Sequence, residues 1–496
     1  MLEDSDPIWY EICSTRDTRI GSGCPHYTEC FVTKARAAAM RAKLVITNHH
    51  LYFADLAMRQ KGATLLPPHE VAIFDEAHGL EDIATEFFSF SVSPGRIGRV
   101  LRDAKNSALA AKLSDDPAEN RRGRLVEQAG KLAEGLFFHF RGETDGRIAL
   151  HPEEIPQEAE DAYFKLDAGL DAVEQSLRII EGRDQGVDKA TDRIEELRND
   201  LYRIMTREEK GYVHWKETRR RTVLIGASPI DVAEFLRNGI FFSIPSVILT
   251  SATLSAGGSF KFLKSRLGID FEVREISKAS PFNFEEQSIL YLPAKMPDPR
   301  EQTFCDAAAA QIADLVQITG GGALVLFTSF RNLTKTSALL RERHELRVLV
   351  QGDRPKGVLI EEFTSGDCAI LAATSSFWQG VDIPGDPLRL LIIDKLPFAS
   401  PGDPLVAARV EYLRSEGKKP FIEYQVPMAA LLLKQGVGRL IRTRYDRGII
   451  AILDNRLRKM PYGKTFFKSL PQTGQTENIE ELVTWWNRTS LSDSVG

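Results

Sequence analysis

Long apolar runs, an apolar leader and a large excess of one charge are all missing from this sequence. No apolar stretch approaches the roughly 20 residues that a helix needs to cross a bilayer. The chain opens on Met1 to Asp6, an acidic stretch that does not resemble a secretory signal peptide. These absences argue against a membrane or secreted protein, and we expect a cytoplasmic one.

A net charge of −5 over 496 residues excludes a generally basic coat for nucleic acid. It leaves room for a local basic groove, because such a groove needs positive charge on one surface only. The hydrophobic share of 43% is enough for more than one core. The length predicts roughly two to four domains.

Cysteine is scarce, but its placement is uneven. Cys13, Cys24 and Cys30 lie within 18 residues, whereas Cys305 and Cys368 stand alone in apolar or helical surroundings. In a large cytosolic chain, clustered cysteines indicate metal or cluster ligation rather than disulfides. The two isolated cysteines are expected to be small core residues.

The apolar pattern changes along the chain. Two short apolar runs, 44–46 and 71–74, end at polar residues, as buried parallel strands do. Between 91 and about 210 the apolar positions follow helical spacing and predict a helical insertion. One such stripe consists of Leu166, Leu170, Val173 and Leu177.

Strands return after about residue 211, at 222–225 and 247–249. Beyond about 263, apolar strands and helices alternate, which predicts an α/β fold with a doubly wound parallel sheet. The strands are expected at 323–327, 348–350, 369–372, 390–393 and 449–453. The helices between them include 303–317, 330–343 and 427–441.

The run VAIFDEAH at 71–78 is the first motif that carries chemistry. It places Asp75 and Glu76 at the end of an apolar strand, where ligands bind in parallel sheets. An Asp there can hold Mg²⁺ on a nucleotide, and the Glu can polarise an attacking water. The alternative is a strand followed by an acidic helix start.

The second motif is QGVGRLIR at 435–442. On a continuous helix, Gln435, Arg439 and Arg442 share one face, and two arginines there can clamp a phosphoryl group. Gly438 would let another backbone come close. The alternative is a basic helix with surface salt bridges.

Two weaker motifs complete the set. The turn at 377–385 carries Asp382, suited to a ribose or strand backbone, and Trp378, which would stack on a base or anchor a core. At 249–254, Ser251 and Thr253 offer hydroxyls that can relay hydrogen bonds, although a cap or turn role explains them equally.

Taken in their order along the chain, 71–78, 249–254, 377–385 and 435–442, the four motifs resemble motifs II, III, V and VI of superfamily 2 helicases. The segments at 48–50, 321–329 and 394–398 are similar to the XPD/DinG-like iron–sulfur branch, particularly its bacterial DinG/YoaA type. The resemblance covers nearly the whole chain. It implies two RecA-like motor domains, the first incomplete, with a cysteine-containing insertion and a helical arch.

Site roles follow from this resemblance. Asp75 would hold Mg²⁺, Glu76 would activate water, and Ser251 with Thr253 would couple hydrolysis to DNA movement. Trp378 would contact DNA. The residues that would serve the ATP site are His78, Asp382, Gln435, Gly438, Arg439 and Arg442. The domains would be an iron–sulfur region 1–42, motor domain 1 at 43–90 and 211–262, an arch at 91–210, and motor domain 2 at 263–496.

The sequence departs from this family in two places. No G-x-x-x-x-G-K-[ST] phosphate-binding loop occurs in residues 1–496, and the glycines at 320–322 precede a strand instead of following one. We expect either an N-terminal truncation or loss of that part. Gln379 also stands where relatives often have Glu.

The cysteines form the second departure. A [4Fe–4S] cluster takes four thiolates, and the family position five residues before Cys24 is Arg19 here. Cys13, Cys24 and Cys30 are the expected ligands, with the fourth unassigned. A vestigial site, or zinc held with His26, are the alternatives.

The resemblance therefore predicts an ATP-dependent DNA helicase that moves 5′ to 3′ on single-stranded DNA or at a fork. ATP, Mg²⁺ and a possible [4Fe–4S] cluster are its cofactors, and the nucleoid is its expected place. A non-catalytic DNA-binding relic and an RNA-directed helicase are the other hypotheses.

Overall fold

The computed structural model divides into two compact units. Unit 1 comprises 1–72, 79–247 and 401–409, and unit 2 comprises 73–78, 248–400 and 410–496. The structure describes residues 8, 21–60, 62–110, 117–142, 145–180, 185–219, 222–365, 370–374, 377, 383 and 387–492. None of the helices in those ranges is long and apolar enough to cross a membrane.

Unit 2 is built on a parallel sheet, which confirms the predicted α/β class. Its order in the described part of the chain is β13-β7-β12-β11-β8-β10-β9, with every pair parallel. The strands are β7 (Ser288–Tyr291), β8 (Ala323–Leu326), β9 (Val348–Val350), β10 (Ile370–Ala373), β11 (Leu390–Ile393), β12 (Gly448–Ile452) and β13 (Gly474–Thr476). The expected strands within this sheet are found to within one residue.

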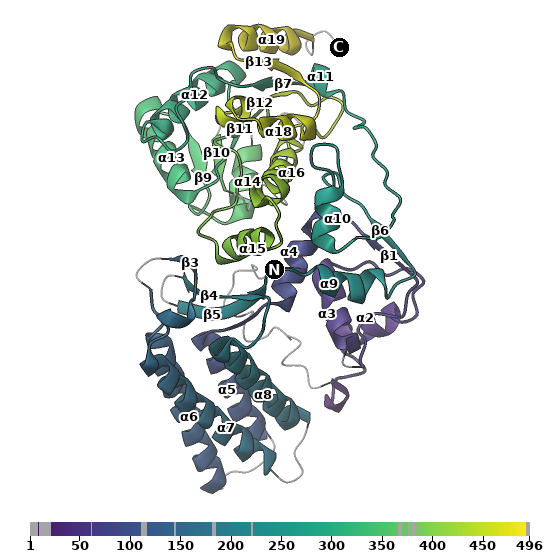
Figure 1. Ribbon diagram of the computed structural model, residues 1–496, viewed down its shortest axis with the longest axis vertical. Helices are drawn as coiled ribbons and strands as arrows, with labels where there is room; N and C mark the ends of the chain where they lie inside the picture. Colours follow the sequence, from purple (N-terminus) through teal and green to yellow (C-terminus); the bar gives the residue numbers. More distant parts are fainter. Residues whose placement is uncertain are drawn as a thin grey trace. The chain divides into compact units, whose positions relative to one another are not determined.

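Helices cover both faces of this sheet (Figure 1). Alternate side chains of a strand point to opposite faces; on β8, Leu324 and Leu326 join one cluster, and Ala323 and Val325 the other. The first face packs against α14 (Lys356–Thr364), α16 (Val426–Val437) and α18 (Gly463–Ser469). The second packs against α12 (Phe304–Thr319), α13 (Phe330–His344) and α19 (Ile479–Ser492). Cys305, on α12, is buried as expected, and Cys368 lies outside the described residues.

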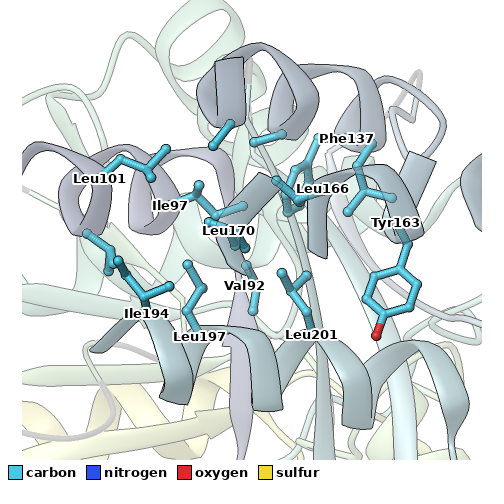
Figure 2. Packing of buried hydrophobic residues seen from close by; sticks show 14 of the residues in the cluster. Val92, Ile97, Leu101, Phe137, Tyr163, Leu166, Leu170, Ile194, Leu197 and Leu201 are labelled. Carbon is cyan, nitrogen blue, oxygen red and sulfur yellow. The ribbon is translucent and has the colours of Figure 1, made fainter. Parts of the chain in front are cut away.

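Unit 1 contains a bundle of four helices beside an antiparallel sheet. The sheet has the order β2-β5-β4-β3. Its strands are β2 (Phe90–Val92), β3 (Gly146–Ala149), β4 (Tyr212–Arg219) and β5 (Thr222–Pro229), and the helices are α5 (Pro94–Ala110), α6 (Pro117–Phe138), α7 (Gln157–Arg178) and α8 (Gln185–Thr206). The predicted stripe on α7, from Leu166 to Leu177, is buried against α8 (Figure 2).

A two-stranded sheet pairs β1 (Val71–Phe74) with β6 (Ser246–Leu249); both strands were predicted, but their pairing was not. The strand predicted at 44–46 is wrong. Leu44 and Ile46 are 77% and 92% exposed in irregular backbone between α2 (Phe31–Ala39) and α3 (His49–Gln60). An apolar run has strand propensity, but it becomes a strand only where a neighbouring ladder accepts its backbone groups.

Candidate functional site

Asp75 and Glu76 lie exposed in the turn that follows β1. Backbone hydrogen bonds fix both sides of this turn: Thr250 N donates to Phe74 O at 2.9 Å, and Ala77 N donates to Thr250 O at 3.0 Å. Glu76 has φ of +48°, a left-handed conformation that is uncommon for a residue with a side chain. Such a conformation persists only where the surrounding structure holds it.

Four side chains in unit 2 form a hydrogen-bonded cluster behind this turn. Ser251 Oγ donates to Glu76 Oε2 at 2.8 Å and accepts from Thr253 N at 3.1 Å. His78 Nδ1 lies 3.0 Å from Ser251 Oγ and 3.3 Å from Thr253 Oγ1. Because the single hydroxyl proton of Ser251 points to Glu76, the proton between Ser251 and His78 belongs to the imidazole.

Gln435 extends the cluster from a distant part of the sequence. It lies on α16, and its Nε2 donates to Thr253 Oγ1 at 3.3 Å. Its Oε1 is buried and accepts no hydrogen bond from the described residues. Glu76, Ser251, Thr253 and Gln435 come from three of the four predicted motifs, so the structure brings those motifs together at one place. We call Glu76, His78, Ser251, Thr253 and Gln435 the polar relay.

The predicted helix face for Arg439 and Arg442 is wrong. α16 ends at Val437, with Gly438 as its C-cap, so both arginines lie in the turns beyond the helix. The glycine prediction also needs correction. A Cβ at Gly438 would meet Lys434 O at 3.3 Å, so the backbone that lies close is that of its own helix.

Local hydrogen bonds to Asp446 and long-range ones to Gln287 explain why the helix stops. The Asp446 carboxylate accepts from Arg442 N at 2.7 Å and from Thr443 N at 2.8 Å. Buried Gln287 donates its amide to the carbonyls of Thr443 and Asp446. These bonds hold 442–446 as a turn, while two glycines in QGVG weaken the helix before it. Arg442 therefore lies at the start of a turn that these bonds hold in place, and Arg439 lies in the turn before it; both are partly buried.

Asp394 is a buried carboxyl in this sheet to which the sequence analysis gave no role. It follows β11 and is wholly buried, accepting from Thr328 N at 3.0 Å, Lys395 N at 2.8 Å and Asn332 Nδ2 at 3.0 Å. Burial raises its pKa to about 6. It ties the loops after β8 and β11 together at the carboxyl edge of the sheet. An Asp directly after an apolar strand was the available signal.

Other predicted site residues lie outside the described residues, namely Cys13, Gln379, Trp378 and Asp382. Cys24 and Cys30 are partly buried and form no disulfide within the described residues. Within the described ranges, no group of three or more His, Cys, Asp or Glu residues is arranged to hold a metal. Two thiols do not supply the four that a [4Fe–4S] cluster takes, so the described residues do not form a cluster site.

Comparison with known proteins identifies the family. A model described as DEAD_2 matches residues 18–97, and one described as a helicase C-terminal domain matches 312–473. The chain is 36% identical to the ATP-dependent DNA helicase YoaA of Haemophilus influenzae, over 97% of this chain and 75% of the relative. The chain belongs to the YoaA/DinG helicase family.

Further members of the family agree. YoaA of Escherichia coli is 37% identical over 97% of this chain and 75% of its own length, and the helicase DinG of Mycobacterium tuberculosis is 31% identical over 99% and 73%. Among solved structures, an XPD helicase matches with a TM-score of 0.55 at 14% identity, covering 86% of this chain and 72% of that one. That likeness shows the fold and confirms the predicted α/β architecture with two RecA-like domains, while the cysteine-containing insertion stays a prediction.

Proposed function

We propose that this chain acts as an ATP-dependent DNA helicase. In this proposal, the polar relay takes part in ATP hydrolysis and couples it to DNA movement. The carrying observation is the hydrogen-bonded path from Glu76 through Ser251 and Thr253 to Gln435. Family membership supports ATP and DNA as substrates. Movement from 5′ to 3′ on single-stranded DNA is proposed from the resemblance to XPD/DinG-like helicases.

Glu76 of the relay and the charged residues of the same motifs have separate tasks. Asp75 would hold the Mg²⁺ that neutralises phosphate charge, and Glu76 would accept hydrogen bonds from the attacking water. Glu76 Oε2 already accepts from Ser251, which leaves its other oxygen available for water. Arg439 and Arg442 would stabilise the charge that develops on the γ-phosphate.

The missing phosphate-binding loop favours a second candidate function. Backbone N–H groups and a lysine at the phosphates are what make such a nucleotide site bind tightly. Residues 1–496 contain no such loop. The second candidate is therefore a DNA-binding protein that keeps the helicase shape and does not hydrolyse ATP.

ATP hydrolysis by the purified 496-residue chain, with and without single-stranded DNA, separates these functions. The helicase proposal predicts DNA-stimulated turnover that falls by a factor on the order of 10² or more in Glu76→Gln, because the neutral amide cannot act as a base towards the attacking water. Glu86→Gln is the matched control: its side chain on α4 (Leu80–Phe88) is 77% exposed, and it leaves turnover unchanged.

The contrary result is equally clear. No turnover at any nucleotide or DNA concentration, with fluorescence anisotropy still reporting binding of labelled single-stranded DNA, would reject hydrolysis by this chain and support the DNA-binding function. A chain that neither hydrolyses ATP nor binds DNA would reject both.

A further inference from the structure

Arg409 is a buried arginine that none of the helicase motifs includes. It lies on α15 (Pro404–Ser415), within the 401–409 segment of unit 1, and is only 3% exposed. A buried guanidinium is costly unless its donors are paired. Here its Nε donates to Ile230 O at 3.0 Å, and its Nη2 donates to Thr85 Oγ1 at 2.9 Å and to Glu81 Oε1 at 2.9 Å.

These bonds fix one particular helix. Glu81 and Thr85 are both on α4, and Thr85 Oγ1 also donates to Glu81 O at 2.8 Å. Ile230 directly follows β5, so Arg409 ties α4 to the end of a strand. The guanidinium is planar and rigid, and the Glu81 side chain is only 12% exposed. The position of α4 is therefore held by a charge pair that water and salt screen only weakly.

α4 begins next to the turn that carries Glu76. Only Ala77, His78 and Gly79 separate Glu76 from Leu80, the first residue of α4. The strained backbone at Glu76 needs support from both sides. Thr250 supplies it through its bonds to Phe74 before the turn and to Ala77 directly after it. Beyond Ala77 the chain runs through His78 and Gly79 directly into α4, which Arg409 holds.

We propose that Arg409 is a positioning residue for ATP hydrolysis, which fixes α4 and thereby the orientation of the Glu76 carboxylate. This inference rests on the proposed function, since it gives Glu76 its role towards water. The stretch 401–437 then contributes to the hydrolysis site in two ways. Its Arg409 holds α4, and its Gln435 hydrogen-bonds Thr253 of the polar relay.

The test compares two arginines of the same helix in the full chain. Arg409→Met removes the buried charge, whereas Arg414→Met removes an exposed one: Arg414 is 63% exposed and pairs with exposed Glu411. Because Arg409→Met leaves Glu81 buried without its partner, the double variant Glu81→Gln/Arg409→Met is included. It loses the tie without leaving a lone buried charge.

Hydrogen–deuterium exchange and steady-state hydrolysis are the two readouts. We expect peptides covering 73–79 and 80–88 to exchange at least about tenfold faster in both Arg409 variants, with α7 and α8 unchanged. The kcat for DNA-stimulated hydrolysis falls by a factor on the order of 10², while the KM for ATP stays within about twofold. Arg409→Lys keeps the charge and recovers part of kcat. Arg414→Met behaves as the unchanged chain.

Two results would overturn the proposal. One is a folded double variant whose 73–88 peptides exchange as in the unchanged chain. The other is a rise in exchange spread evenly over unit 1, which would mark Arg409 as a residue of general stability. If the unchanged chain hydrolyses no ATP, the proposed function fails by itself, and the exchange data still decide whether Arg409 fixes α4 and the Glu76 turn.

Discussion

At the residue scale, the site consists of short polar side chains that the sequence places far apart. Asp75, Glu76, Ser251 and Thr253 were identifiable because each follows an apolar strand, and the structure brings the last three within hydrogen-bonding reach of one another or of His78. Gln435 was identifiable from its motif. The bonds between them depend on how the strands and α16 pack, which no local pattern specifies. Arg409 carries no motif at all.

The buried carboxyl of Asp394 gives a pH prediction. Its pKa is raised to about 6 in the folded state by burial, with Lys395 acting in the opposite direction, against about 3.9 in an unfolded chain. Folding therefore favours the protonated form of the Asp394 carboxyl over the charged form. Its stabilising contribution is complete below about pH 4 and is lost as pH rises through 6.

The variant Asp394→Asn removes this dependence. Its Oδ1 still accepts from Thr328 N and Lys395 N, and the Asn332 amide can turn to accept from it. Between pH 4 and 7, the free energy of unfolding should rise in the variant relative to the unchanged chain by about 3 kcal/mol. Urea unfolding at several pH values measures this. Parallel curves would contradict it, and Asp353→Asn, with a 52% exposed side chain, is the control.

At the element scale, the apolar sequence pattern predicted strands and helices where burial decides the structure. It failed where pairing with another strand, or hydrogen bonds to another segment, decides it. Five strands of the unit 2 sheet, β8 to β12, were predicted because each is buried along its length, whereas the equally buried β7 and the short edge strand β13 were not predicted. The run at 44–46 has the same composition but no pairing partner among the described residues. α16 stops early because Asp446 and Gln287 bind the following turn, and the Gln287 bonds span 156 and 159 residues, an interval that no local pattern covers.

The core of the helical part of unit 1 yields a second prediction (Figure 2). Leu170 is fully buried on α7, whereas Ile179, just past the end of the same helix, is 74% exposed. Leu170→Ala should lower the free energy of unfolding of this unit by about 2–5 kcal/mol, through lost burial and a cavity. Ile179→Ala should change it by less than about 0.5 kcal/mol. Exchange protection of α8 peptides measures both, and equal effects would contradict the packing described for α7.

At the scale of the whole molecule, the order of motifs along the chain was the strongest signal. It pointed to the XPD/DinG-like family, since four motifs in one order are far more specific than any one of them. The domain boundaries expected from composition stay predictions. The division into two compact units differs in kind from them, because 73–78 and 401–409 each belong with residues far away in the sequence. Only three-dimensional contacts assign these two segments to their units.

The polar relay is the central claim, and a double-mutant cycle tests it most directly. DNA-stimulated ATP turnover would be measured in Ser251→Ala, in Gln435→Ala and in the double variant. If these residues act as one unit through Thr253, the double variant is no slower than the slower single variant, because the first change has already broken the path. Losses in kcat that multiply, so that the two free-energy effects simply add, would contradict the account.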